Sequence, residues 1–336
     1  MSLEVWPHLP FAELQKELQA TEKRELDWQL DELRETLTNL KQSLEDCYKL
    51  LGPDGNGNTL VVSTPRNEAV KGHITRLGTQ IVRGSMHIRL RTLPHQTLTI
   101  DPRQPITIGP LAALHTLLTR SIDLLALTLA YSYPPPRSPP GEPGTLPLHG
   151  RNDTFISTQL RVLAQALTDA LALLKGPAPT PGDPAWSTRS VSLSHFSPAL
   201  PSAVSFYIGL QDSQLVLWLR AVEPVGVPLN FGMKFALALG TARRIEHDEA
   251  DKVFTYSCED GTAKGLHSPQ PAGSATSDVD EPRPEGPAEV YVREKVRIES
   301  ADPSLMSLSA KLGALNHALL LVRRNLAAVM GEELED

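Results

Sequence analysis

The sequence predicts an α+β protein: an elongated, antiparallel up-down four-helix bundle and a separate antiparallel β domain, both discontinuous in sequence. Four long stretches carry leucine-rich apolar stripes with the period of an α-helix. Two other sections alternate apolar and polar residues, as half-buried strands do. One strand section separates the first helix from the second, and the other separates the third from the fourth. An up-down helix order therefore brings both strand sections to one end of a bundle, where they merge with few unpaired edges.

The composition bounds the class of protein. The chain has 336 residues, of which 40% are hydrophobic, enough for one or two cores. Its formal net charge of -7 argues against a nucleic-acid partner, because phosphate contact needs a clustered basic face. The two cysteines, Cys47 and Cys258, form neither a disulfide framework nor a zinc set, and they suit a reducing compartment. Residues 1–10 lack the basic start and apolar run of a signal peptide.

We expect no membrane-spanning segment. The most apolar helix, 111–131, carries His115, Arg120 and Asp123, which are too many ionisable groups for a bilayer core. The expected location is therefore the cytoplasm.

The first helix is predicted by apolar residues that alternate spacings of four and three, which is the pattern of a packed helix. Gly52 and Pro53 then stop it. Phe11, Leu14 and Leu18 form an amphipathic lead-in, which we interpret as a separate turn because polar residues occupy the next stripe positions. The stripe consists of Leu26, Leu30, Leu33, Leu37, Leu40, Leu44, Cys47 and Leu51.

Three further helices complete the predicted bundle. Gly109-Pro110 opens the second, Asn152 or Asp153 caps the third, and Asp302-Pro303 opens the last. Their stripes are Leu111, Leu114, Leu118, Ile122, Leu125 and Leu129; Ile156, Leu160, Leu163, Leu167, Ala170 and Leu174; and Leu305, Leu308, Leu312, Leu315, Leu319, Val322, Leu326 and Val329. The bundle is thus assigned to 11–51, 110–175 and 303–331.

The β domain is assigned to 58–101 and 186–300. Alternation or β-branched runs predict strands near 70–75, 86–90, 98–100, 203–210, 215–222, 253–256 and 290–298, the last skipping Glu294. Two Pro-rich segments, 134–150 and 259–287, are expected to be disordered linkers.

The motifs of ligand and metal sites are incomplete. Gly55-Asn56-Gly57 has Leu60 where a dinucleotide fingerprint needs its third glycine. Asp54, Asn56 and Asn58 imitate the start of a calcium loop, but Thr59 replaces the required glycine and Pro65 the bidentate glutamate. The ten histidines show no metal-ligand spacing. We therefore predict neither a metal nor a cofactor.

The candidate catalytic residues also have ordinary structural interpretations. His247-Asp248-Glu249 resembles a proton-transfer group, but charged loop clusters are far commoner. His115 and His317 lie beside core positions of helices, and Cys47 occupies a stripe position, which favours a small core residue over a nucleophile. We expect no catalytic residue and no enzymatic activity.

Three segments of this sequence resemble one known family. The pattern from Glu25-Leu26-Asp27-Trp28-Gln29-Leu30 to Leu51, the stretch Val70-Lys71-Gly72 and the segment Phe196-Ser197-Pro198-Ala199-Leu200-Pro201-Ser202 are similar to Rogdi, the leucine-zipper-containing family. Its fungal counterpart is the second subunit of the RAVE complex, the regulator of the ATPase of vacuolar and endosomal membranes. The resemblance covers most of the chain outside the two Pro-rich segments.

The resemblance implies a helical bundle with a β domain and a non-catalytic role in assembling the vacuolar proton pump (V-ATPase). Members join a large β-propeller scaffold and help return the soluble catalytic sector to the membrane sector, with the pump's C subunit among the contacts. Membrane association is then peripheral and through partners. The two Pro-rich segments depart from shorter members of the family.

Two other functions stay open at this stage. The first is a generic coiled-coil adaptor or tethering protein that forms a homodimer through 26–51; the second is an enzyme with an unrecognised site. Partner-binding residues are not assigned. For 196–202 we prefer a proline-bounded entry into a strand over a docking loop, and for Trp28 we prefer a place covering a bundle edge over a partner contact.

Overall fold

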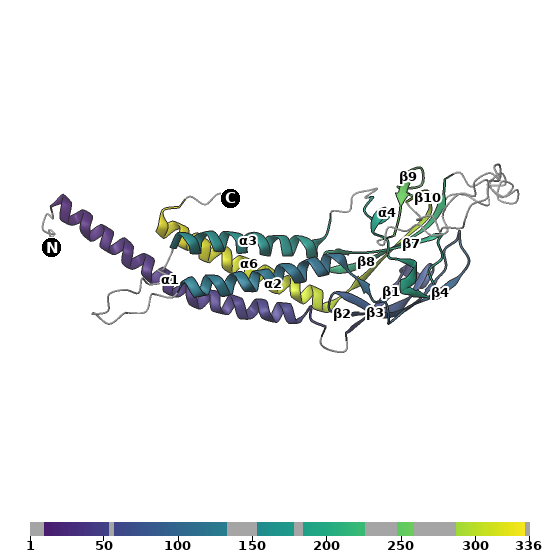
Figure 1. The fold of residues 1–336 in the computed structure, drawn as a ribbon, viewed down its shortest axis with the longest axis horizontal. Coiled ribbons are helices and arrows are strands. Elements are labelled where there is room, and N and C mark those ends of the chain that lie inside the picture. Colours follow the sequence, from purple (N-terminus) through teal and green to yellow (C-terminus); the bar gives the residue numbers. More distant parts are fainter. Residues whose placement is uncertain are drawn as a thin grey trace, which may run out of the picture. The chain divides into compact units, whose positions relative to one another are not determined.

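The computed structural model describes residues 10–53, 57–132, 153–177, 184–225, 247–258 and 287–332. Over these residues the protein is mixed α+β, with five α-helices and two antiparallel sheets (Figure 1). The chain divides into two compact units, each discontinuous in sequence. The predicted linker 134–150, and all of 259–287 except Pro287, lie outside the described residues. Unit 1 is Met1–Lys49, Thr116–Leu171 and Ala310–Asp336, and unit 2 is Leu50–His115 and Ala172–Ser309.

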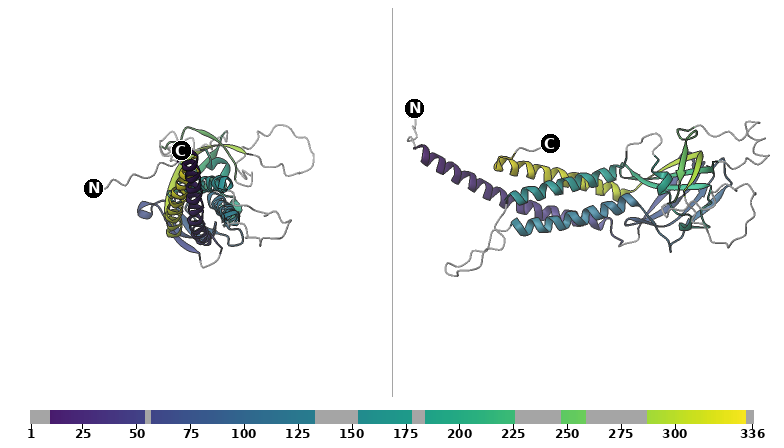
Figure 2. Two further views of the ribbon diagram at one scale, coloured as in Figure 1. Left: turned by 90° about the vertical axis from the view of Figure 1, so that its left-hand side faces the viewer. Right: turned by 45° about the horizontal axis from the view of Figure 1, so that its top comes forward.

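Unit 1 is helical. Figures 1 and 2 draw stretches of its four long helices side by side. Near the end of α2, Arg34 of α1 donates a hydrogen bond from Nη2 to the Ser132 carbonyl at 2.9 Å. Near the start of α3, the Ser157 hydroxyl donates to a carboxylate oxygen of Glu332, just beyond α6, at 2.7 Å. The helices are α1 (Phe11–Lys49), α2 (Gly109–Ser132), α3 (Asp153–Lys175) and α6 (Pro303–Met330).

The apolar stripe of α1 is buried within its own chain from Leu30 onwards. Leu30, Leu33, Leu37, Leu40, Leu44 and Cys47 are all at most 3% exposed. The expectation of a separate lead-in turn was wrong, because residues 11–28 continue the same helix. Helical propagation needs no new nucleus once the buried part has formed. Leu26 is half-buried, and Leu51 is buried just after the helix ends.

The buried stripe of α2 differs from the predicted one at two positions. Ile122 and Leu129 are only half-buried, and Ser121 and Thr128 take the buried places. Each hydroxyl donates to the carbonyl four residues earlier, so burial leaves no unpaired polar atom. The apolar pattern hid this register, because leucine is abundant on both faces of the helix.

The stripes of α3 and α6 agree more closely with prediction. All six predicted residues of α3 are at most 1% exposed. In α6, Leu315, Val322 and Val329 are half-buried, while the other five predicted positions are buried.

By length and composition alone, α2 and α6 are apolar enough to cross a membrane. In the most apolar stretch of each, 33% of the residues of α2 and 22% of those of α6 are buried. Long core helices pass the same test, so this finding by itself places neither helix in a bilayer.

Unit 2 contains both sheets. The first sheet has the order β1-β2-β3-β4-β6, and β5 pairs with β3. Pairing of β4 with β6 joins the two strand sections of the sequence. Its strands are β1 (Asn58–Ser63), β2 (Val70–Leu77), β3 (Gln80–Ile88), β4 (Gln96–Ile100), β5 (Ile106–Thr107) and β6 (Phe196–Ser197).

The second sheet has the order β7-β8-β10-β9. The register between β10 and β8 shifts between Val292 and Glu294, which explains why the sequence alternation skips a residue there. Trp186 of the short helix α4 (Trp186–Arg189) packs on this sheet's core with Phe254 and Tyr256. The strands are β7 (Val204–Gln211), β8 (Gln214–Pro224), β9 (Val253–Tyr256) and β10 (Ala288–Ala301).

The β7–β8 hairpin caps the end of α3. Asp212 and Ser213, both at positive φ, donate their backbone amides to the carbonyls of Lys175 and Leu174, each at 2.8 Å. These carbonyls would otherwise lack a partner at a helix end. The close approach requires glycine at position 176, where φ is 73° and an added Cβ would lie 2.0 Å from the Leu210 oxygen.

A buried carboxylate, Asp302, joins β10, α6 and the first sheet. It caps α6 by accepting from the amide and hydroxyl of Ser304 at 3.0 and 2.8 Å. Asn58 of β1 donates to the same oxygen at 3.1 Å, and Nε of Arg76 on β2 donates to the other. Burial alone would raise the pKa of Asp302, but the hydrogen bond and charge of Arg76 hold that pKa below its ordinary value.

Replacing Asp302→Asn should lower the free energy of unfolding by about 3–5 kcal/mol, because Arg76 is left charged, buried and without its counter-ion.

Because the pKa of Asp302 is lowered in the folded state, its contribution to stability is complete above the unfolded pKa of about 3.9 and is lost as pH falls through the folded pKa. Urea denaturation at neutral and acidic pH measures both effects. The matched control, Asp46→Asn, breaks an exposed pair with Lys49 and should leave stability unchanged. An equal loss in both variants would contradict the assignment.

Candidate interaction surface

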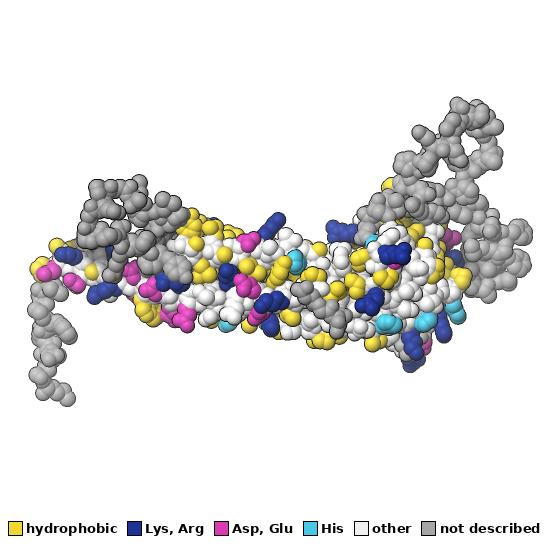
Figure 3. Space-filling view, turned by 60° about the horizontal axis from the view of Figure 1, so that its bottom comes forward, with side chains coloured by type: hydrophobic (Ala, Val, Ile, Leu, Met, Phe, Trp, Pro, Cys, Tyr) yellow, Lys and Arg dark blue, Asp and Glu magenta, His cyan; other side chains and the backbone are white. Residues whose placement is uncertain are grey.

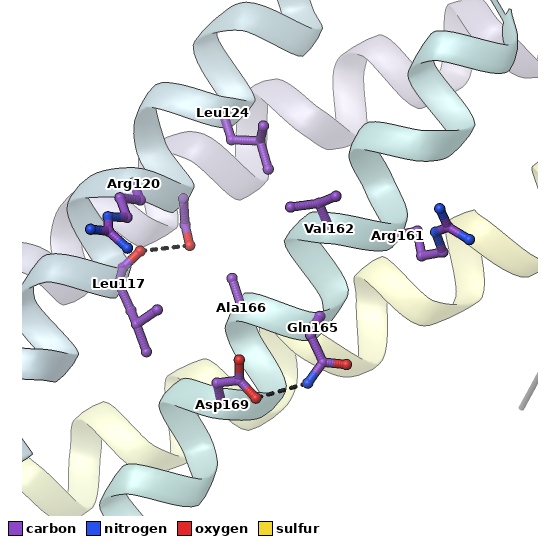
Figure 4. Close-up of a pocket in the computed structure, with 9 residues that line it drawn as sticks. Leu117, Arg120, Leu124, Arg161, Val162, Gln165, Ala166 and Asp169 are labelled. Carbon is purple, nitrogen blue, oxygen red and sulfur yellow. Dashed lines mark hydrogen bonds between the residues drawn. The ribbon is translucent and has the colours of Figure 1, made fainter.

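An apolar groove lies between α2 and α3 within unit 1. Leu117 and Leu124 of α2 face Val162 and Ala166 of α3 across it (Figure 4). The groove encloses about 550 Å³. Val162 is 49% exposed, so its side chain is only partly covered by the described residues. Apolar surface of this kind on a helical face is typical of a place where another helix packs.

The register of α2 explains why leucines line the groove. Since Ser121 and Thr128 occupy the buried stripe, Leu117 and Leu124 fall on the neighbouring face of the helix. Leu127, 46% exposed, is a further leucine outside the stripe. The surplus of leucine on α2 is the sequence signal that could have revealed this surface.

The rim of the groove is polar and mainly cationic. Arg120 of α2 and Arg161 of α3 border it, and neither guanidinium has an ion-pair partner in the part of the chain that the structure describes. Gln165 donates to the Asp169 carboxylate at 2.8 Å along α3. An apolar floor between two free arginines suits an amphipathic helix that carries acidic residues beside its apolar stripe.

The first part of α1 is a second exposed apolar surface. Phe11, Leu14, Leu18 and Trp28 are 81%, 47%, 53% and 63% exposed. Trp28 is only partly covered by the described residues, and its place at a bundle edge stays a prediction. Figures 1 and 2 show the start of α1 running beyond the neighbouring helices of unit 1.

The segment 196–202 places two side chains in the core, while Ser197, Pro198, Ala199 and Pro201 are exposed. Phe196 begins β6 and is 3% exposed, and Leu200 is 2% exposed. The Phe196 ring also packs edge-on against Phe206 at 5.1 Å between centroids. This favours the strand-entry interpretation over a docking loop.

His247-Asp248-Glu249 belongs to a buried ion cluster. Arg220 on β8 donates to both oxygens of Glu249 at 2.7 and 2.9 Å, and Lys295 on β10 reaches Glu249 at 2.6 Å and Asp248 at 3.0 Å. Burial would raise the pKa of Glu249, but the hydrogen bond and charge of Arg220 lower it. The cluster ties residues 247–252 to the second sheet, and its carboxylates are engaged by cations.

His247 itself is held as a neutral acceptor. Its Nδ1 accepts a hydrogen bond from the backbone amide of Glu249 at 3.1 Å. Burial lowers the pKa of His247, and the nearby Glu249 carboxylate offsets this only in part. Together these contacts explain the motif as a structural turn.

The other flagged residues lie apart from one another. Cys47 is fully buried in the α1 stripe, and burial raises the pKa of its thiol to about 11. His115 is half-buried on α2, whereas His317 is exposed on α6. Residues 54–56 of the glycine-rich turn lie outside the described part, and Asn58 hydrogen-bonds to Asp302 and Ser304. Among the described residues, no three His, Cys, Asp or Glu side chains gather as metal ligands.

The comparison with known families decides the identity. The family model of Rogdi leucine zipper containing proteins matches residues 25–327. The chain belongs to the Rogdi leucine zipper family. No curated protein sequence matches it. The Rogdi match includes the α2–α3 groove and both sheets, and it begins after the exposed turns at the start of α1. In this Rogdi-family chain the zipper stripe is buried intramolecularly.

The two cysteines should be unreactive in the folded protein. Both are at most 2% exposed, and the Cys47 thiol, with a pKa of about 11, is almost wholly protonated at pH 8. Ellman's reagent should therefore label neither thiol in native buffer and both after unfolding. Ser307→Cys, on an exposed position of α6, supplies a reactive control. Rapid labelling of Cys47 in the native protein would show that the site is accessible.

Proposed function

We propose that this protein is a non-catalytic subunit of a RAVE-like complex and promotes V-ATPase assembly by protein–protein docking. The observation that carries the proposal is the Rogdi family match over residues 25–327. The proposed partners are a large β-propeller scaffold and soluble-sector subunits of the pump such as the C subunit. The protein is then cytoplasmic and reaches vacuolar or endosomal membranes through these partners.

We further propose that α1, α2, α3 and α6 form an antiparallel up-down four-helix bundle. Each helix has a buried apolar stripe, and mutual burial accounts for all four. Two contacts fit an up-down order. Arg34 of α1 contacts Ser132 at the end of α2, and Ser157 near the start of α3 contacts Glu332 just beyond the end of α6.

The groove between α2 and α3 is the proposed docking place for the scaffold. Its occupant is an amphipathic helix of the scaffold subunit that places apolar side chains on Leu124 and Val162 and acidic side chains beside Arg120 and Arg161. Charge complementarity favours this occupant, because two arginines without ion-pair partners among the described residues border an apolar floor.

Val162→Arg should weaken scaffold binding by about tenfold or more, because it places a charge on the apolar floor of the groove. Affinity for the purified scaffold and co-purification at native abundance measure the effect. Leu320→Arg, which alters a similarly exposed apolar residue of α6, is the matched control and should bind normally. Melting temperatures close to wild type should establish that both variants fold. Full binding by Val162→Arg, or equal loss in the control, would refute the groove as the docking place.

The alternative, a coiled-coil adaptor that dimerises through 26–51, needs an accessible stripe. The structure buries the apolar stripe of α1 from Leu30 to Cys47 within one chain, which disfavours that dimer. Leu37→Ala should therefore lower the free energy of unfolding by about 2–5 kcal/mol and leave the molar mass unchanged. Denaturant titration and light scattering in dilute solution measure the two quantities. A dimeric wild type that Leu37→Ala converts into a folded monomer would support the adaptor instead.

A further inference from the structure

The outward face of the first sheet collects lysine, arginine and histidine side chains. Lys71 and His73 on β2, Arg83 and His87 on β3, and Arg89 just after β3 are all exposed. Strand register places Lys71 directly opposite His87. The chain as a whole has 39 acidic and 32 basic residues, so this concentration runs against the overall balance. Figure 3 shows histidine, lysine and arginine side chains close together over this part of unit 2.

No carboxylate belongs to the two cross-strand rows of this face. Neighbouring strands place hydroxyl groups beside the basic side chains instead, and neither row holds Phe, Tyr or Trp. The rows are Ser63, Lys71, His87 and Thr97, followed by Val61, His73, Ser85 and Thr99.

The cations of this face lack counter-ions. Among the residues that the structure describes, Lys71, Arg83 and Arg89 form no ion pair. Glu68, in the turn before β2, lies 4.0 Å from Arg66. The charge is therefore available to an external anion.

Two adjoining hollows lie on the face. The first, about 430 Å³, is lined by Ala69, Lys71, His87 and Arg89. The second, about 540 Å³, shares Lys71 and His87. Several small residues line the second hollow. Glycine is required at position 72, because an added Cβ there would lie 2.2 Å from a backbone oxygen of β3. The remaining residues of the second hollow are Val61, Ser63, Gly72, His73 and Ser85.

Hydrogen bonding orients one imidazole across the face. Nδ1 of His87 lies 2.8 Å from the Thr97 hydroxyl oxygen. This contact orients the ring of a residue that lines both hollows. Lysine, arginine and hydroxyl donors in such an arrangement are the usual ligands of phosphate oxygens.

We propose that this face binds the phosphorylated headgroups of anionic membrane lipids. Two open, adjoining hollows on a flat sheet fit neighbouring headgroups of a bilayer, and Val61, 69% exposed, borders them. A single-stranded nucleic acid would need Phe, Tyr or Trp side chains for stacking, and the two cross-strand rows of this face hold none. The proposal does not depend on the V-ATPase role, because it rests on the sheet alone.

The test uses full-length protein and two kinds of vesicle: phosphatidylcholine alone, and phosphatidylcholine with phosphatidylinositol bisphosphate. Wild type should sediment with the second kind only. Lys71→Ser combined with Arg89→Ser should bind those vesicles about tenfold or more weakly, because each cation near an anionic surface adds to the attraction. Lys252→Ser with Arg189→Ser removes the same charge from exposed positions elsewhere in unit 2 and should bind as wild type.

Soluble inositol hexakisphosphate should displace the wild type from the vesicles, since it presents the same phosphate chemistry. Equal loss in both double variants would overturn the proposal, because attraction would then be general. Absence of sedimentation with phosphoinositide vesicles would also overturn the proposal. If the protein then bound polyglutamate, RNA or the soluble inositol phosphate, the face would be assigned to that anion instead.

Discussion

The buried ion pair between Asp302 and Arg76 fixes the point at which sheet turns into helix. Asp302 directly follows β10, caps α6 and accepts hydrogen bonds from Asn58 of β1 and Arg76 of β2, so one carboxylate contacts three elements. A charge in such surroundings is tolerated only with its partners in place. This single group caps the start of α6.

The α2 helix shows how a small departure in the core creates a surface. The hydroxyl groups of Ser121 and Thr128 donate hydrogen bonds to backbone carbonyls of their own helix, so both residues can be buried among leucines. Leu117 and Leu124, which lie outside the buried stripe of α2, line the groove between α2 and α3. The register of one helix thus determines both which residues of α2 fill the core and which line the groove that we propose as a docking place.

Much of the architecture followed from the sequence, because periodicity reports burial directly. The α3 stripe, β9 and the irregularity near Glu294 were all predictable. The α2 register was not, since hydroxyls that bond to the preceding turn look like surface residues. The basic face of the first sheet could not be predicted from net charge, because that charge is summed over the whole chain. Strand pairing brings Lys71, His87 and Arg89 together from separate segments.

The exposed first turns of α1 have a thermodynamic consequence. An isolated peptide of this length pays a large entropic cost to form its first helical turn. Here the buried stripe from Leu30 onwards supplies that nucleus, so residues 11–28 extend a helix that already exists. A protein that captures Phe11 and Leu14 meets a preorganised ligand, and little of the contact energy is spent on ordering the chain.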